Sequence, residues 1–356
     1  MKGRTQNVVL EGIKSAPKPV LSGVPQGTVL GPLLFLIYIN DISSGLTEGT
    51  TLRLFADDSL LYREINCPED ADILQADLNK LQAWEKKWMM EFHPQKCQVL
   101  TITKKRTNIQ KDYSIHNIKL ERKNSAKYLG VTIDDQINWK EHITNTCKKA
   151  NGTLSFLRRH LAQCPRYIKA KAYEVYVRPT LEYSSNVWDP YQQKNIDQIE
   201  NIQRRAARFV CSQYKRQTSV STLQTQLNWT SLQERRAKSK VTMIYKANNQ
   251  MCHIPTEELT INTNRRTRRA STNFDIPRSR TNLHLYSFHP SAIRLWNRLP
   301  ENIKSVNSLA TFKSKISTIN VRSEHDSDVL GNQSLRPKNI LSNVSQHTAA
   351  ALVTSD

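Results

Sequence analysis

The sequence lacks the features that define several common protein classes. Its six cysteines are scattered, and no two of them form a C-x-x-C pair, which argues against a zinc knuckle or a disulfide framework. Glycine contributes only 10 of 356 residues, which argues against a low-complexity chain. The longest apolar run, residues 29–39, contains Gly31 and Pro32 and is too short to span a bilayer. We therefore expect reduced thiols, no membrane segment and an intracellular location in the nucleus or cytoplasm.

Acidic residues are also scarce. Lys and Arg number 52 against 31 Asp and Glu, which gives a net charge of +21. A surplus of this size favours a polyanionic partner, most often nucleic acid, although a merely basic protein is the alternative. Composition alone does not separate a nucleic-acid enzyme from a nucleic-acid binder. Residues 321–356 carry four acids against three bases and show no periodicity, so we expect a disordered tail.

Hydrophobic periodicity predicts an α+β chain in its first part. An apolar helix with Pro32 in its first turn is expected to be buried. An amphipathic helix follows, in which Trp84 and Trp88 are predicted core anchors rather than a surface for base stacking. Helices are predicted from about residue 30 to about residue 43 and over 68–92, strands over 51–56, 59–65 and 97–103, and a hairpin between 113 and 133.

The pattern becomes helical from Trp139 onward. Ile143, Cys147, Ala150, Leu154 and Leu157 recur at helical spacing, which predicts one buried face. Further helices are predicted over 167–177, interrupted by Pro179, and over 196–210, 219–227, 230–249 and 289–300. Residues 265–280 hold six arginines and one acid, which is typical of a basic arm or loop.

Two adjacent carboxylates, Asp57 and Asp58, separate the first two predicted strands. They are expected on the tight turn of a β-hairpin. Neighbouring carboxylates repel each other unless a cation lies between them, and a divalent metal prefers such oxygen ligands. For a bare Asp-Asp pair, a solvated turn is the alternative interpretation. The surrounding motifs decide between the two.

The pair belongs to the last of four motifs that follow one another in the sequence. They are Ser22–Gly27 (SGVPQG), Gly31–Phe35 (GPLLF), Tyr38–Ile42 (YINDI) and Phe55–Asp58 (FADD). In order and spacing they resemble the reverse transcriptases of non-LTR retrotransposons, of the LINE or jockey-like type. The resemblance extends over about residues 4–315. It implies a partial polymerase palm of antiparallel sheet and packed helices over 1–103, a primer-grip-like hairpin over 104–138, a helical thumb and basic C-terminal region over 139–320, and the tail over 321–356.

The resemblance also implies a reaction and its residues. Nucleotidyl transfer would use two Mg²⁺ or Mn²⁺ ions, with Asp57 as principal ligand and Asp58 in support. The partners would be an RNA template, a DNA primer and deoxynucleoside triphosphates. Phe55 would pack under the hairpin, and Lys96 would serve the triphosphate unless it is simply solvated. The remaining roles fall to Pro25, Gln26, Gly27, Phe55 and Ala56 in the nucleotide and template pocket, Tyr128, Leu129 and Gly130 in the primer grip, and Arg204, Arg205 and Arg208 on nucleic-acid phosphates.

One catalytic element of the family has no counterpart in the sequence. Its third carboxylate lies in a D-x-x-x-A-F-D-type motif upstream of Ser22, whereas residues 1–21 contain Glu11 as their only acid. The fingers are absent as well. We therefore expect a fragment of an RNA-directed DNA polymerase, from a truncated element or a gene model that starts too late, that is inactive alone. The alternatives are a non-catalytic nucleic-acid-binding protein and a pseudogene product.

Overall fold

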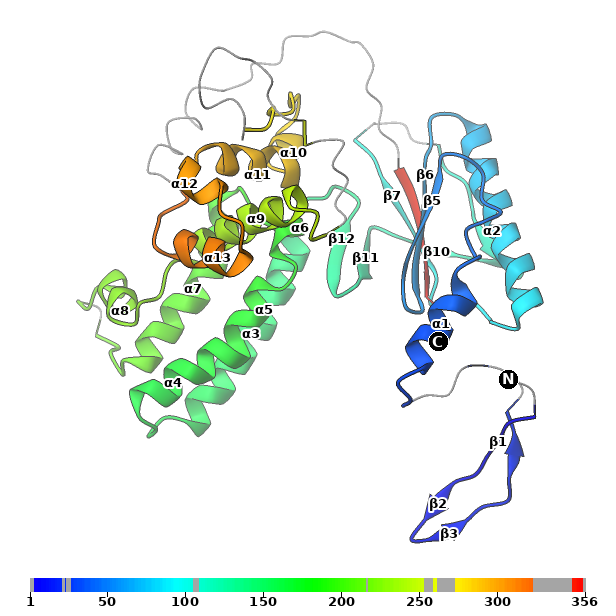
Figure 1. Ribbon diagram of the computed structural model, residues 1–356, viewed down its shortest axis with the longest axis horizontal. Coiled ribbons are helices and arrows are strands. Elements are labelled where there is room, and N and C mark those ends of the chain that lie inside the picture. Colours follow the sequence, from blue (N-terminus) through cyan, green and yellow to red (C-terminus); the bar gives the residue numbers. More distant parts are fainter. Residues whose placement is uncertain are drawn as a thin grey trace. The chain divides into compact units, whose positions relative to one another are not determined.

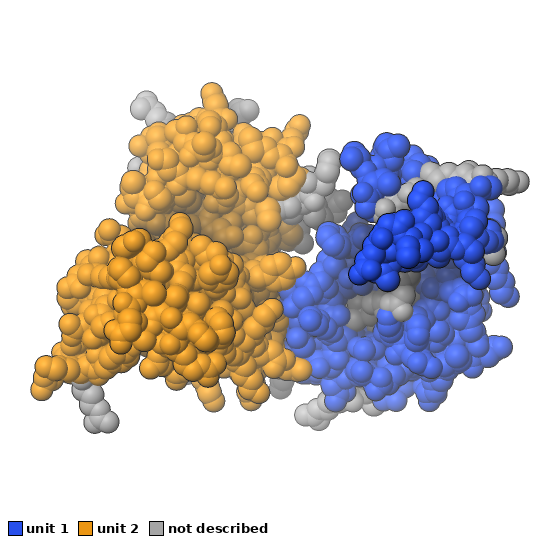
Figure 2. Space-filling view, turned by 90° about the horizontal axis from the view of Figure 1, so that it is seen from below, with its two compact units in different colours: residues 1–137, 342–356 blue, residues 138–341 orange. Residues whose placement is uncertain are grey.

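The computed structural model describes residues 3–20, 23, 27–104, 109–215, 217–252, 259–260, 273–322 and 348–354. The chain divides into two compact units, which Figure 2 shows in different colours. Unit 1 comprises residues 1–137 and 342–356, and unit 2 comprises residues 138–341. Helices and strands are mixed, so the predicted α+β class is confirmed.

A five-stranded sheet organises unit 1, in the order β10-β7-β13-β6-β5 (Figure 1). Strands β5 and β6 form an antiparallel hairpin, whereas β6 and β7 both pair antiparallel with β13 and are therefore parallel to each other. A parallel pair needs a crossover connection, and helix α2 supplies it. The sheet strands are β5 (Thr50–Phe55), β6 (Asp58–Glu64), β7 (Gln98–Ile102), β10 (Glu121–Lys123) and β13 (Thr348–Thr354).

Short hairpins make up the remaining strands of unit 1. Strands β1 and β4, β2 and β3, β8 and β9, and β11 and β12 pair antiparallel in two-stranded sheets. Their bounds are β1 (Thr5–Gln6), β2 (Val9–Leu10), β3 (Ile13–Lys14), β4 (Lys18–Pro19), β8 (Ser114–Ile115), β9 (Ile118–Lys119), β11 (Ser125–Tyr128) and β12 (Val131–Asp134).

The strand between β6 and β7 comes from the C-terminal segment of the chain. We expected residues 321–356 to be disordered, and for residues 348–354 this prediction is wrong. Two parallel strands separated by one strand's width leave backbone groups unpaired on both inner edges. An extended segment that enters between them satisfies both edges at once. Residues 323–347 lie outside the described residues.

Helix α2 (Pro68–Trp88) packs on one face of this sheet and forms the core of unit 1. It begins as predicted at Pro68, where the Asp70 carboxylate accepts hydrogen bonds from backbone N–H groups at the helix start. Trp84 is 9% exposed and Trp88 packs beside it, with the ring of Tyr38 edge-on to both. The prediction that the two tryptophans are core anchors is confirmed.

The two tryptophans provide a matched pair for a stability test. The indole N–H of Trp84 donates to Oδ1 of Asp41 at 2.7 Å, whereas the indole N–H of Trp88 is buried and finds no acceptor in the part of the chain that the structure describes. Trp84→Phe should lower the free energy of unfolding of unit 1 by about 1.5–3 kcal/mol, because a hydrogen bond to a charged group is lost. Trp88→Phe should stay within about 1 kcal/mol of wild type. Hydrogen exchange of the α2 amides measures both, and equal losses would contradict the assigned bond.

Helix α1 (Gly31–Ile39) is more exposed than the sequence predicts. Leu33, Leu36 and Ile37 are 55%, 59% and 67% exposed, so the prediction that this apolar helix is buried is wrong. Its C-terminal end does reach the core, where Ile39 is buried. Phe35 and Tyr38 are half-buried against the same core, whereas no described segment of the chain covers Leu33, Leu36 and Ile37.

Every regular element among the described residues of unit 2 is a helix. The predicted inner face of α3 is buried, which confirms the periodicity analysis, and α7 also buries one face. The helices are α3 (Lys140–His160), α4 (Arg166–Ala172), α5 (Arg178–Glu182), α6 (Ser185–Trp188), α7 (Gln193–Val210), α8 (Val220–Gln226), α9 (Leu232–Asn248), α10 (Asn282–Leu285), α11 (Phe288–Asn297), α12 (Glu301–Lys304) and α13 (Leu309–Ser317), with a π-helical turn η1 (Tyr173–Val177) between α4 and α5.

Pro179 does not end the helix that precedes it. Residues 166–182 continue from α4 through η1 into α5, with Pro179 in the first turn of α5. The N–H of Arg178 bonds to the carbonyl of Tyr173, five residues back, so the turn before the proline is wider than an α-helical turn. This wider turn accommodates the proline, which has no N–H to donate and would clash in an ordinary α-helix. Pro179 thus interrupts the regular α-helix, as predicted, but the chain remains helical up to Glu182.

A buried charge cluster joins α9 to the segment after α6. The carboxylate of Asp189 accepts from Nε of Arg236 at 2.6 Å and lies 2.9 Å from Nζ of Lys240. All three side chains are at most 5% exposed. Burial raises the pKa of Asp189, but the charges of Lys240 and Arg236 outweigh it and hold that pKa below its usual value.

Candidate functional site

The Asp57–Asp58 pair lies at a hairpin turn, as predicted. Phe55 pairs with Asp58, which leaves Ala56 and Asp57 as a two-residue turn between β5 and β6. Ala56 has φ of +51°, an unusual conformation for a residue with a side chain. Asp57 is exposed and Asp58 is half-buried as the first residue of β6. The hairpin therefore presents two carboxylates at one end of the five-stranded sheet.

The predicted primer-grip residues lie near this turn. Leu129 and Gly130 form the two-residue turn between β11 and β12, with φ of +45° and +80°, as a tight hairpin requires. Tyr128 packs in a small apolar cluster that includes Leu60 of β6. Burial raises the pKa of Tyr128, and the negative charge of Asp58 raises it further. The structure thus brings the two predicted parts of the site together.

Lys96 lies at the same end of the sheet as the carboxylates. It is exposed in the turn before β7, and its N–H bonds to the carbonyl of His93. Leu352 of β13 is paired with Leu60 of β6 on one side and with Gln98 of β7 on the other. Asp58 comes two residues before Leu60, and Lys96 comes two residues before Gln98. Because one strand lies between β6 and β7, their backbones are about 10 Å apart. Lys96 therefore lies at the same end of the sheet as Asp58, about two strand spacings away.

The predicted nucleotide pocket is described only in part. Pro25 and Gln26 lie outside the described residues, whereas Gly27 has φ of +74°, which favours glycine on backbone grounds alone. Phe55 is 64% exposed, so the expectation that it packs under the hairpin is wrong. It lies at the end of the edge strand β5, which no described segment covers. Its ring and Ala56 remain available to a ligand.

The predicted phosphate contacts lie on the outer face of α7. Arg204 and Arg205 are exposed, and Arg208 is half-buried. Arg204 is 3.7 Å from Asp197, and Arg205 donates to Oδ1 of Asn151 on α3. Arg208 donates to the carbonyl of residue 215 and thereby holds the turn after α7. Two of the three arginines are thus accessible to a polyanion, and the third also has a structural task.

The donor set at the turn fits a divalent cation in part. Among the described residues, no group of three or more His, Cys, Asp or Glu side chains is arranged to hold a metal ion. Asp57 and Asp58 supply two carboxylates, and Mg²⁺ is commonly held by one or two carboxylates together with waters and substrate phosphates. These two residues would therefore hold Mg²⁺ or Mn²⁺ weakly until a phosphate-bearing substrate completes the coordination.

Comparison with known proteins decides the family. Residues 5–133 match the family model of reverse transcriptase (RNA-dependent DNA polymerase). The probable RNA-directed DNA polymerase from transposon BS of Drosophila melanogaster is 30% identical over 219 residues, and the RNA-directed DNA polymerase from mobile element jockey of Drosophila funebris is 30% identical over 222 residues. The matched part of the chain is therefore similar to jockey-like, non-LTR reverse transcriptases. The resemblance seen in its motifs is thereby confirmed.

The alignment with these reverse transcriptases covers only part of this chain and a smaller part of each relative. It covers 58% of this chain and 24% of the transposon BS polymerase, and 59% and 24% in the case of jockey. The chain thus spans about a quarter of the length of these relatives. No solved structure showed significant similarity to it. Within the described ranges, no helix combines the length and apolar character that crossing a membrane requires.

Sequence reasoning missed the charged residues that unit 2 buries. Asp189, Arg236 and Lys240 belong to no recognisable motif, and Asp189 is far from the other two in the sequence. A signal was present in α9, where Arg235, Arg236, Lys238, Lys240 and Lys246 recur in a helix that also has a buried face. A helix with this many basic residues cannot place all of them on its solvated face. Some of them are therefore expected to be buried and paired with acids.

Proposed function

We propose that this chain forms the palm turn, the primer-grip hairpin and the helical thumb region of an RNA-directed DNA polymerase. The observation that carries the proposal is the Asp57–Asp58 turn, with Tyr128 beside Asp58 and Lys96 at the same end of the sheet. The match of residues 5–133 to the reverse transcriptase family supports it. The substrates would be deoxynucleoside triphosphates and a DNA primer on an RNA template.

Each residue of this turn has a distinct task in the proposal. Asp57 and Asp58 would hold one or two divalent ions, which supply Lewis-acid stabilisation of the charge that develops during phosphoryl transfer. Lys96 would neutralise charge on the triphosphate and could donate a proton to the departing pyrophosphate. The turn at Leu129 and Gly130 would hold the primer end against the palm. The exposed ring of Phe55 would contact the nucleotide.

The palm needs a further segment to complete its site. A third carboxylate, for which residues 1–40 provide only Glu11, would come from another segment of polypeptide. The uncovered apolar surface of α1 supports this proposal, since exposed large apolar patches are typical of surfaces that another segment covers. With only two of its three carboxylate ligands, the site would bind a metal ion weakly and would coordinate the reacting phosphate incompletely.

We expect the 356-residue chain alone to extend no primer on an RNA template, even at millimolar Mg²⁺ or Mn²⁺. The measurement is primer extension with labelled deoxynucleotides on a poly(rA) template with an oligo(dT) primer. Extension that disappears in Asp57→Ala would contradict the expected inactivity, although it would still support the carboxylate assignment.

Duplex binding tests the thumb region independently of catalysis. Each phosphate contact with duplex DNA contributes about 0.9 to the slope of log affinity against log salt concentration. The double variant Arg204→Gln/Arg205→Gln should therefore reduce this slope by about 1.8, with weaker binding at low salt. Lys148→Gln/Lys149→Gln, which removes the same charge from α3, is the matched control. If both double variants bind duplex equally, the assignment of the α7 face fails.

A further inference from the structure

A basic groove runs along one side of α9 in unit 2. Its volume is about 650 Å³, and its lining comes from α5, α6, α9 and α13. One face of α9 lines the groove with Arg235, Ser239, Thr242 and Lys246. These residues share a face because they are three or four positions apart on the helix. This volume lies within the range of roughly 300–1,000 Å³ that is typical of ligand sites.

The charge of the groove is one-sided. Five basic side chains line it, Arg235, Arg236, Lys238, Lys246 and Lys313, against one acid, Glu182. Glu182 is already engaged, because Arg235 donates to both of its carboxylate oxygens. Arg236 is paired with Asp189 and Lys238 with Glu234, so the positive charge that the groove presents rests on Lys246 and Lys313.

An unsatisfied guanidinium lies in the lining of the groove. Nε of Arg236 donates to Asp189, but Nη1 and Nη2 are buried and have no hydrogen-bond partner among the described residues. The Arg236 side chain is fully buried, but it forms part of the inner wall of the groove. Buried donors without a partner are rare, and a guanidinium fork matches the paired oxygens of a phosphate.

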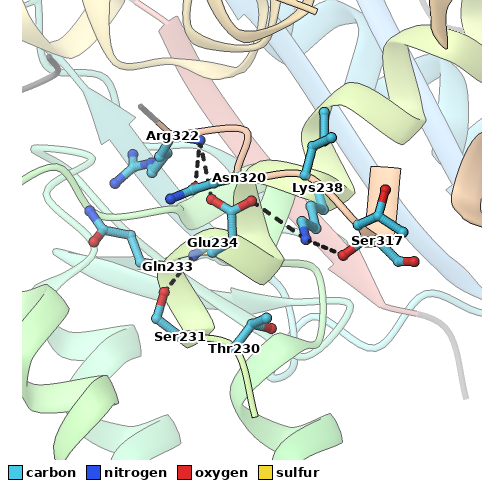
Figure 3. A pocket seen from close by; sticks show the side chains of 10 residues that line it. Thr230, Ser231, Gln233, Glu234, Lys238, Ser317, Asn320 and Arg322 are labelled. Atoms are coloured by element: carbon cyan, nitrogen blue, oxygen red, sulfur yellow. Dashed lines mark hydrogen bonds and ion pairs between the residues drawn. The ribbon is translucent and has the colours of Figure 1, made fainter. Parts of the chain in front are cut away.

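A second hollow continues from the groove (Figure 3). It measures about 470 Å³ and shares Thr230, Lys238 and Ser317 with the groove. Figure 3 shows Lys238 between Glu234 and Ser317, and the Glu234 carboxylate turned toward Arg322. That carboxylate accepts from the N–H groups of residues 321 and 322, so it is satisfied by the chain itself. The two adjoining hollows suit an extended anion rather than a single free phosphate.

We propose that the groove along α9 binds the phosphodiester backbone of a single-stranded nucleic acid. The proposal rests on the nucleic-acid function proposed above and adds a second contact surface to it. A duplex displays its phosphates on a wide cylinder, whereas a flexible single strand can enter the hollow and meet Lys246 and Lys313. Backbone contacts of this kind carry no base information, so RNA and DNA single strands of mixed sequence should bind alike.

The test uses the whole chain and fluorescence anisotropy with labelled single-stranded RNA, single-stranded DNA and duplex probes across about 50–200 mM salt. Ser239→Asp places a negative charge in the groove, and Ser239→Asn is its near-isosteric control. Lys246→Gln/Lys313→Gln removes two groove cations, and Lys86→Gln/Lys315→Gln removes two exposed cations that do not line it. These positions avoid Arg236, whose loss would unbalance the buried charge cluster.

The expected result is a selective loss of single-strand binding. Lys246→Gln/Lys313→Gln should lower the salt slope by about 1.4, since each single-strand contact contributes about 0.7. Ser239→Asp should weaken binding relative to Ser239→Asn, and both single-stranded probes should respond equally while the duplex does not. The proposal would be overturned if the groove variants bound single strands as tightly as their controls do. It would also be overturned if the groove variants lost as much affinity for the duplex as for single strands. Neither outcome alters the duplex test of the α7 face, so the two proposals fail separately.

Discussion

Asp57→Asn should reduce primer extension at least about 100-fold in a completed polymerase. The reason is that even residues that only support metal ligands cost roughly 10–100-fold when they are replaced, and Asp57 is proposed as a ligand itself. A suitable enzyme is a chimera that joins the upstream part of the jockey polymerase to residue 5 of this chain, where the family match begins. Asp58→Asn should have a smaller effect because its carboxylate is half-buried beside Tyr128.

The matched control for this prediction lies on the same strand. Glu64 is exposed at the opposite end of β6, about 20 Å from Asp58 by the rise of a strand. Glu64→Gln removes one carboxylate from the sheet without touching the turn, and the chimera should retain its activity. A chimera that remains fully active with Asp57→Asn would contradict the proposed role of this residue.

Asp189→Asn should destabilise unit 2 by about 3–5 kcal/mol. Removing this carboxylate leaves the charges of Arg236 and Lys240 buried without a counter-charge, and breaking a buried pair from one side costs about this much. Urea denaturation followed by circular dichroism measures the loss. Asp197→Asn is the control, because its partner Arg204 is 3.7 Å away and both side chains are more than 40% exposed. That change should cost no more than about 0.5 kcal/mol.

The same cluster predicts a pH dependence. The folded-state pKa of Asp189 lies below its unfolded value, which is about 3.9. Its contribution to stability is therefore complete above about pH 4 and is lost as pH falls through the folded-state pKa. In Asp189→Asn this acid-induced loss should be smaller than in wild type. A pH profile that is identical in both would contradict the ionised state of the buried carboxylate.

Local patterns in the sequence predicted the elements whose structure depends on near neighbours. The hairpin at Asp57 needs only two strands and a short turn. Helix α2 needs its cap at Pro68 and its apolar spacing up to Trp84, and α7 needs its buried face. The order of motifs also placed the carboxylates and the primer-grip turn in one family site, which the packing of Tyr128 near Asp58 supports.

Features that depend on distant partners were not predictable in this way. The apolar sequence of α1 indicates burial, but burial requires a segment that covers Leu36 and Ile37. Strand β13 has no local signal because its pairing depends on the open edges of β6 and β7. Likewise, the charge of Arg236 gives no hint that Asp189 lies opposite it, 47 residues away in the sequence.

The most direct test of the carboxylate turn is the site-specific line broadening caused by Mn²⁺. Weak binding suits this measurement, because a paramagnetic ion in fast exchange broadens only the nearby amide signals of a labelled chain. A metal held by Asp57 and Asp58 should first broaden the signals of residues 55–59, then those of Tyr128 and Lys96, and Asp57→Asn/Asp58→Asn should abolish the effect. Broadening that begins elsewhere, or that persists in the double variant, would contradict the metal-binding role on which this account depends.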